Sequence, residues 1–305
     1  GVYGNGQFRL AAIDPAQLTF THITDAAAVE SPLAVDTSLT EVYWNSLNGQ
    51  PLPATLQEAR EYADRLEERY GVTILLSAQA QEACDAVWDA TITTTDQWPL
   101  EDEPHAIARM LEALDRTLAL YPDGFFRQMK NTMGEGGVRF MPVGHIENAV
   151  NAIGLTYETY GWQNIYIDVT IDAFEGTICH EIWHAIEGVL LTRNWNAIDQ
   201  EEWAACNPAG FSYNEDAETP DSNPERWTFF YEFSAQDVYF VDAYSRTNAK
   251  EDRARIMEYI MATEDVAGAL VQSPAIAQKL QIMCRAIREN FDTSSWGELR
   301  WERVL

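Results

Sequence analysis

Apolar residues recur at three- and four-residue spacing in several parts of the chain, and this period predicts amphipathic helices. One such segment runs from Leu56 to Tyr70 and ends at Gly71, a residue that readily takes the left-handed conformation of a helix C-cap. Another begins at Pro104 and stops before Pro122. Its predicted buried face consists of Ile107, Leu111, Leu114 and Leu118.

The same period runs through residues 174–193, where no proline interrupts the pattern. The predicted buried stripe of this helix consists of Phe174, Ile178, Ile182, Ile186 and Val189. Two further helices are expected, one beginning near residue 248 and one after Ser273. The last helix is expected to bury Ile276, Leu280, Cys284, Ile287 and Phe291.

Three segments have the character of strands. Residues 72–76 form a short apolar run, and residues 137–143 are predicted to form a second strand. Residues 164–170 alternate apolar and polar side chains, which predicts a half-exposed strand directly before the helix at 174–193. We expect that strand to be the sheet edge with which an extended peptide could pair.

These elements predict an α+β fold with a small mixed sheet, one central helix and a mostly helical C-terminal part from about residue 248. Residues 1–52 contain Pro15, Pro32 and Pro51 and show no clear period, so we expect a loop-rich N-terminal extension. The main domain is then expected to cover residues 53–305.

The helix at 174–193 contains the motif His180-Glu181-x-x-His184. Residues four apart lie on one face of a helix, about one turn from each other, so both imidazoles can reach a single metal ion. Glu181 is rotated away from that pair, yet it can reach a water at the metal. Two histidines with a nearby carboxylate base make up most of a zinc hydrolase site. We therefore expect Zn²⁺ at His180 and His184.

A third ligand is needed, and the sequence leaves several candidates. The metzincin pattern is excluded because the chain has Glu187 and Leu190 where that pattern requires Gly and His. A thermolysin-like arrangement, with a Glu about twenty residues downstream on a second helix, would use Glu201 or Glu202. However, Asn207-Pro208 follows soon after and leaves little room for that helix.

The segment around Tyr244-Ser245-Arg246-Thr247-Asn248 and Glu251-Asp252 offers another candidate. Together with the His-Glu-x-x-His motif it resembles zinc metallopeptidases akin to the anthrax lethal-factor protease domain. In that group a Tyr precedes the ligand Glu by seven residues, as Tyr244 precedes Glu251. The resemblance covers about residues 55–265 and implies a zincin-like domain of the gluzincin type. It also implies Glu251 as third zinc ligand and Tyr244 as donor to the oxyanion.

The chain departs from that group at Arg255, where the group often has Glu. Without the resemblance, Glu251 remains plausible because Thr247 or Asn248 can cap a helix whose first turn holds two carboxylates. Asp252 stays an alternative ligand, since one residue rotates a side chain by about 100° around a helix.

Composition limits the classes of partner. The formal net charge of −28 argues against nucleic acid and against anionic membrane surfaces. No run of eighteen apolar residues occurs, so no transmembrane segment is predicted. The chain begins with Gly1, so we expect an extracellular or cell-surface protein from which an export signal or lipid anchor has been removed.

The sequence thus predicts a zinc-dependent peptidase acting on a peptide or protein substrate. His180, His184 and Glu251 are its expected metal ligands, with Glu181 as general base and Tyr244 as oxyanion donor. The alternative is a non-catalytic surface or adhesion module that zinc stabilises.

Overall fold

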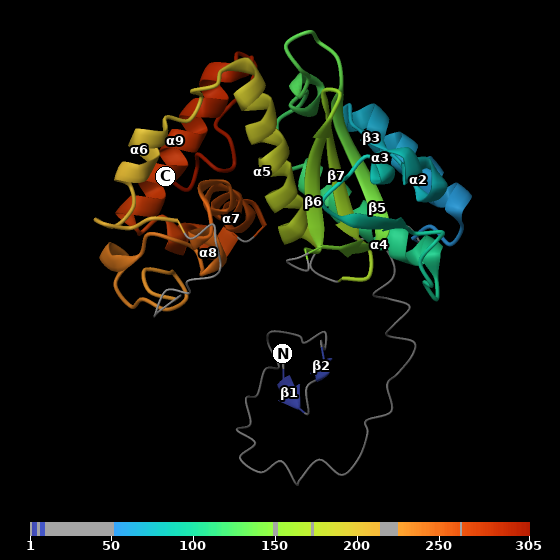
Figure 1. Ribbon diagram of the computed structural model, residues 1–305, viewed down its shortest axis with the longest axis horizontal. Helices are drawn as coiled ribbons and strands as arrows, with labels where there is room; N and C mark the ends of the chain where they lie inside the picture. Colours follow the sequence, from blue (N-terminus) through green and yellow to red (C-terminus); the bar gives the residue numbers. More distant parts are fainter. Residues whose placement is uncertain are drawn as a thin grey trace. The chain divides into compact units, whose positions relative to one another are not determined.

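The structure is a computed structural model that describes residues 2–4, 7–9, 52–148, 152–171, 174–213, 225–262 and 264–305 (Figure 1). The chain divides into two compact units, Gly1–Pro51 and Leu52–Leu305. In the first unit, strands β1 (Val2–Gly4) and β2 (Gln7–Arg9) pair antiparallel. Apart from Leu52, the remainder of the predicted N-terminal extension lies outside the described residues.

The second unit contains a five-stranded sheet. Its strands are β3 (Thr73–Ile74), β4 (Thr91–Thr94), β5 (Gly137–Glu147), β6 (Gly154–Thr159) and β7 (Trp162–Asp168). The strand order is β3-β5-β7-β6, and β4 pairs with the C-terminal part of β5. The β3–β5 and β5–β7 pairs are parallel, whereas β4–β5 and β6–β7 are antiparallel. The sheet is therefore small and mixed, as predicted.

The expectation of a half-exposed edge strand at 164–170 is wrong. Strand β7 lies between β5 and β6, and it is buried from Gln163 to Asp168. Its polar residues are buried too; for example, the Asn164 amide donates to the carbonyl of Tyr157 and Asp168 accepts from Thr170. The alternation of apolar and polar residues in this strand therefore arises because its polar side chains are buried and hydrogen-bonded, and not because one face is exposed to solvent. Among the described strands, β6 pairs with β7 alone and forms this edge of the sheet.

The helices that cover the sheet begin and end close to the predicted residues. Helix α2 (Leu56–Tyr70) starts at a capping box between Thr55 and Glu58 and ends at Gly71, whose φ is 74°. Helix α4 (Glu103–Leu118) buries all four predicted apolar residues. Leu56, the first residue of α2, is exposed.

The remaining helices are α3 (Gln81–Asp85), α5 (Phe174–Arg193), α6 (Gln200–Ala205), α7 (Ala249–Ala262), α8 (Glu264–Leu270) and α9 (Pro274–Asn290). Ser273 caps α9 by accepting from the backbone of Ile276, in agreement with the predicted start. No helix among the described residues is long and apolar enough to cross a membrane.

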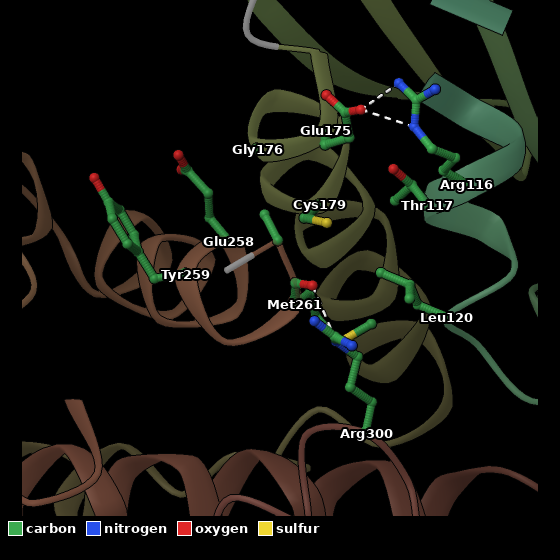
Figure 2. A pocket seen from close by; sticks show the side chains of 11 residues that line it. Arg116, Thr117, Leu120, Glu175, Gly176, Cys179, Glu258, Tyr259, Met261 and Arg300 are labelled. Atoms are coloured by element: carbon green, nitrogen blue, oxygen red, sulfur yellow. Dashed lines mark hydrogen bonds and ion pairs between the residues drawn. The ribbon is translucent and has the colours of Figure 1, made fainter. Parts of the chain in front are cut away.

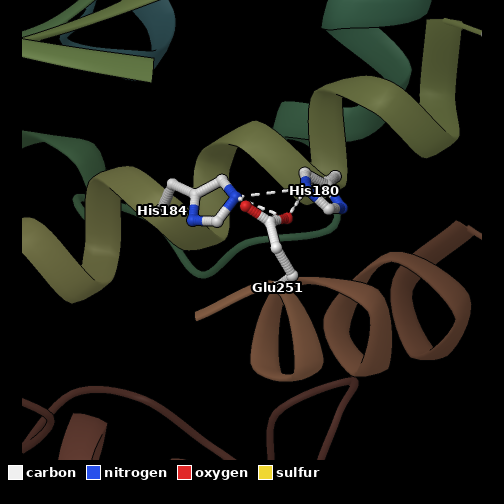
Figure 3. A group of neighbouring side chains, drawn as sticks. All are labelled: His180, His184 and Glu251. Atoms are coloured by element: carbon white, nitrogen blue, oxygen red, sulfur yellow. Dashed lines mark hydrogen bonds and ion pairs between the residues drawn. The ribbon is translucent and has the colours of Figure 1, made fainter. Parts of the chain in front are cut away.

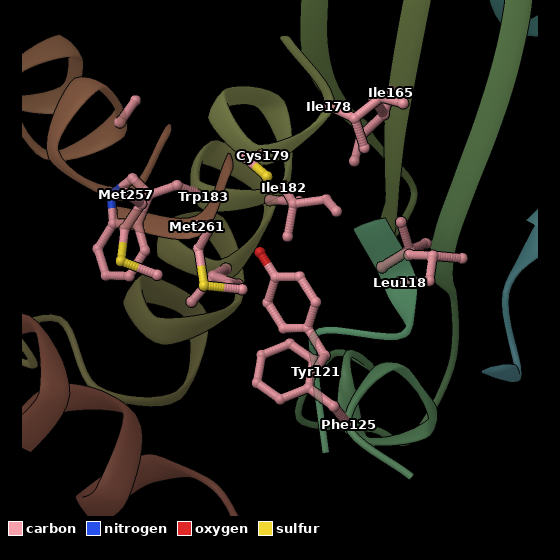
Figure 4. Packing of buried hydrophobic residues seen from close by; sticks show 14 of the residues in the cluster. Leu118, Tyr121, Phe125, Ile165, Ile178, Cys179, Ile182, Trp183, Met257 and Met261 are labelled. Carbon is pink, nitrogen blue, oxygen red and sulfur yellow. The ribbon is translucent and has the colours of Figure 1, made fainter. Parts of the chain in front are cut away.

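Helix α5 lies between the sheet and the helical C-terminal part (Figure 1). Ile178 and Ile182 belong to the same apolar cluster as Ile165 of β7 and Met257 of α7 (Figure 4). Because both sides of α5 are packed, most side chains along it are buried. This packing fixes the position of the His-Glu-x-x-His motif relative to β6 and α7.

Candidate metal centre

His180 and His184 project from one face of α5. The Nε2 atoms of the two imidazoles lie 3.1 Å apart, and the ring planes are nearly perpendicular. His180 is buried and His184 is half-buried. The four-residue spacing thus places two nitrogen ligands at one point, as predicted.

Glu251 approaches this point from the first turn of α7. Its Oε2 lies 3.0 Å from Nε2 of His180 and 3.4 Å from Nε2 of His184 (Figure 3). Asn248 caps the helix, because its side chain accepts from the backbone N–H groups of Lys250 and Glu251. The ligand atoms of the two histidines and Glu251 all lie within 4.8 Å of one another. This group can hold a metal ion.

Asp252, the neighbouring candidate, points away from the histidines. It is fully buried and forms an ion pair of 2.7 Å with Nζ of Lys279 on α9. The hydroxyl of Tyr213 also donates to it, at 2.7 Å. Asp252 therefore anchors α7 in the core and is not a candidate ligand.

Glu201 and Glu202 make no contact with His180 or His184 in the structure. They lie in the first turn of the six-residue helix α6, where Asp199 caps both backbone N–H groups. The carboxylate of Glu202 pairs with Arg285 on α9. The described residues offer no other group of three metal-ligating side chains besides His180, His184 and Glu251, which excludes the thermolysin-like alternative within this part of the chain.

Glu258 supports the site, and the sequence reasoning missed it. Its Oε2 lies 3.1 Å from Nδ1 of His180, so it holds the imidazole at the nitrogen opposite Glu251. Burial acts to lower the pKa of His180, but the hydrogen bonds with Glu251 and Glu258 outweigh it and raise the pKa to about 10. The available signal was helical spacing, because Glu258 follows Glu251 by seven residues and so lies on the same face of α7.

Arg255, the departure from the lethal-factor group, contacts Glu258. Its guanidinium pairs with Glu258 and also with Asp242. Burial acts to lower the pKa of Arg255, but these two carboxylates outweigh it and raise the pKa. Arg255 thus acts on His180 through Glu258. A chain of charged contacts therefore runs from Asp242 to the imidazole.

The carboxylate of Glu181 borders the same cavity as the three ligands. This cavity has a volume of about 410 Å³ and is also lined by Tyr244 and Thr156. The hydroxyl of Thr156 donates to Oε2 of Glu181 at 2.8 Å. Gly154 on β6 leaves room for this arrangement, since a β-carbon there would lie 2.9 Å from the Glu181 carboxylate and 2.7 Å from Thr177, and these side chains would have to shift.

Tyr244 lies in a short 3₁₀ helix, Tyr244–Arg246, just before α7. Its ring centroid is 6.2 Å from that of His180. Burial and the neighbouring Glu251 raise the pKa of Tyr244, so the phenol keeps its proton at neutral pH and can donate a hydrogen bond. All five residues singled out by the sequence therefore border one cavity.

A buried ion pair joins the two helices that carry His180, His184 and Glu251. Arg253 of α7 donates to both carboxylate oxygens of Glu187 on α5, at 2.6 and 2.8 Å. The indole of Trp183 also donates to Glu187 at 3.2 Å. Such a bidentate contact fixes the separation of the helices, because both side chains are buried and the two hydrogen bonds between them are directional.

A larger cavity, of about 570 Å³, lies between α4, α5 and α7 (Figure 2). Glu258 and Cys179 form part of its wall, and Arg116 pairs with Glu175 at its border. Within the described residues it holds no set of metal-ligating side chains. The candidate centre is therefore the smaller cavity.

Comparisons of this chain with protein-family models, with curated proteins and with solved structures give no match. The resemblance to the lethal-factor group therefore rests on two short motifs.

Proposed function

We propose that this protein is a zinc-dependent peptidase. One observation carries the proposal: the ligand atoms of His180, His184 and Glu251 converge in a cavity that the carboxylate of Glu181 also borders. A purely structural metal site needs no carboxylate base beside its ligands. A base next to three ligands is instead the arrangement of metal-assisted hydrolysis.

The donor set fits zinc. Two imidazole nitrogens and one carboxylate oxygen are the three protein ligands of a common class of catalytic zinc sites, in which a fourth position stays open. The ligands border an open cavity, which favours such a position over a closed structural site. When bound, zinc would lower the pKa of a water molecule and polarise the carbonyl group of the substrate.

The residues of the chain then have separate tasks. Glu181, oriented by the hydroxyl of Thr156, accepts the proton of the attacking water and passes it to the leaving nitrogen. The phenol of Tyr244 donates a hydrogen bond to the oxyanion that develops on the carbonyl oxygen as water attacks the carbonyl carbon. Glu258 holds Nδ1 of His180 and so directs Nε2 toward the metal position.

The edge of the sheet at β6 provides a surface for an extended peptide. Gly154, Leu155 and Thr156 of β6 border the cavity together with Glu181. Since β6 has β7 as its one partner among the described strands, its outer edge can accept main-chain hydrogen bonds from a substrate. The proposed pairing strand is thus β6, in place of the strand at 164–170.

A zinc-reloading experiment with a peptide library tests the proposal. Metal-free protein reloaded with zinc is expected to bind one equivalent and to cleave peptides, and a chelator should abolish cleavage. Glu181→Gln should bind the same amount of zinc and lose turnover by at least about 100-fold, because general base catalysis contributes this much. Stoichiometric zinc with raised thermal stability but without cleavage of any peptide would instead support a non-catalytic zinc-stabilised module.

A further inference from the structure

Gln163 of β7 lies in the wall of the candidate active-site cavity, and its side-chain amide has no hydrogen-bonding partner among the described residues. The residue is only 4% exposed, yet its side chain borders the cavity that holds His184 and Glu251. Its amide makes no hydrogen bond to any residue that the structure describes, and its polar atoms are not sealed in the core. Since nearly all such polar groups are hydrogen-bonded, this amide is left to pair with water or with a ligand in the cavity.

Gly188 of α5 makes room for this amide. A β-carbon at position 188 would lie 2.8 Å from Oε1 and 3.1 Å from Nε2 of Gln163. His180, His184 and Gly188 follow each other at four-residue intervals, so they share one face of α5. The Gln163 amide therefore lies against the metal-binding face, one helical turn beyond His184.

The two carboxylates that flank this amide, those of Glu187 and Glu158, are already engaged. The carboxylate of Glu187 also borders the cavity, but Arg253 and Trp183 bind it. Glu158, the cross-strand partner of Gln163, is exposed, and its Oε1 accepts from the backbone of Gly161 at 2.7 Å. The polar group that lies against Gly188 is thus a neutral amide without a partner among the described residues.

We propose that Gln163 and Gly188 form a specificity subsite that binds a neutral, hydrogen-bonding side chain of the substrate, a carboxamide or a hydroxyl. The proposal rests on the proposed peptidase function and names its substrate class. The amide of Gln163 has two N–H donors and one carbonyl acceptor, so it can both donate a hydrogen bond to such a group and accept one from it. An apolar side chain would displace water from the amide without replacing its hydrogen bonds.

The position in the substrate follows from the helix geometry. One turn of α5 separates Gly188 from His184, about 6 Å along the axis. An extended peptide covers this distance in about two residues. The selected side chain should therefore lie within two residues of the bond that is cleaved.

Cleavage of a peptide library by three proteins tests the subsite. Wild-type protein should prefer Asn, Gln, Ser or Thr over Leu at one position by about tenfold, since an unpaired buried amide weakens binding by this order. Gln163→Met, similar in size but apolar, should lose or reverse this preference. Gln163→Glu should shift it toward Lys and Arg. Gln57→Met on α2, outside the cavity, should keep the wild-type preference.

Equilibrium binding gives a readout that is independent of turnover. Glu181→Gln protein should bind an Asn-containing peptide about tenfold more tightly than its Leu counterpart, and Gln163→Met in that background should remove the difference. If Gln163→Met does not fold, Gly188→Ala serves instead, because its methyl group would crowd the amide and should lower the discrimination.

The outcomes separate the two proposals. Cleavage of peptides with a preference that is unchanged in Gln163→Met and Gly188→Ala would overturn the subsite and leave the peptidase proposal in place. Zinc-loaded wild-type protein that neither cleaves nor binds any peptide would overturn the peptidase proposal, and the subsite with it.

Discussion

The carboxylate of Glu258 lies 3.1 Å from Nδ1 of His180, on the side of the imidazole opposite Glu251. This contact fixes which nitrogen of His180 carries the proton when a metal is bound, because a carboxylate accepts a hydrogen bond from Nδ1–H and leaves the lone pair of Nε2 free. A ligand that is oriented in advance binds a metal more tightly than one that rotates. Glu258 is therefore a positioning residue of the proposed centre.

Removal of Glu258 should weaken zinc binding without removing a ligand. We expect Glu258→Ala to lower zinc affinity by about 10- to 100-fold, the usual effect of losing such a partner. Competition with a chelator measures the affinity, and Glu289→Ala, at an exposed position of α9, is the matched control. Equal affinities in the two variants would show that Glu258 does not orient His180.

Truncation of Glu251 should have a much larger effect. Glu251→Ala leaves two imidazoles as protein ligands, so the zinc content of purified protein should fall well below one equivalent. Glu201→Ala should retain full zinc, because Glu201 lies on α6 and is not part of the proposed metal site. Metal analysis of both variants decides the point. Full zinc in Glu251→Ala would contradict the ligand set proposed above.

Loss of Asp252 should act on stability and not on zinc. Asp252→Ala leaves the buried ammonium of Lys279 without its counter-ion, which should lower the free energy of unfolding by about 3–5 kcal/mol. The double variant Asp252→Leu/Lys279→Met should recover most of that loss, because it leaves no unpaired charge at this position. Denaturant unfolding of the metal-free proteins measures both effects. A double variant as unstable as Asp252→Ala would exclude this explanation.

Zinc affinity should increase with pH. The pKa of His180 is raised to about 10, since its hydrogen bonds with Glu251 and Glu258 outweigh the effect of burial. At pH 7 the metal must therefore displace a proton, and this competition should weaken as the pH rises toward that pKa. The association constant should rise by about tenfold per pH unit between pH 7 and 9. Calorimetry in buffers of different ionisation enthalpy should detect the released proton; an affinity that is independent of pH would contradict the assignment.

Tyr244 should contribute to turnover and not to metal binding. Tyr244→Phe removes one hydroxyl and leaves the ring beside His180, so zinc content and KM should stay near those of the wild type. The kcat should fall by about 100- to 1000-fold, the effect of losing one donor to an oxyanion. A fall in zinc content together with kcat would instead assign Tyr244 to the metal site.

Local sequence determined much of the fold. Helix α2 was predictable from its apolar period and from Gly71, and helix α9 from Ser273 and Pro274, because caps and stripes act within a few residues. The placement of His180 and His184 on one face was predictable for the same reason. Four residues make about one helical turn in any fold.

Strand order required the tertiary structure. The alternation at 164–170 suggested an exposed edge, but β7 lies between β5 and β6. Period 2 describes the two faces of a strand and contains no information about its lateral neighbours. The hydrogen-bonding partners of a strand come from segments elsewhere in the chain, so only the assembled sheet makes β6 its edge.

The rotation of α7 also required the tertiary structure. Sequence alone left Glu251 and Asp252 as alternative ligands, since neighbouring residues on a helix differ by about 100° in direction. In the structure Lys279 on α9 binds Asp252 and Glu187 on α5 binds Arg253 in the core, which leaves Glu251 to face the two histidines. These contacts join residues that lie 27 and 66 positions apart in the chain. A local sequence pattern contains no information about such distant pairs.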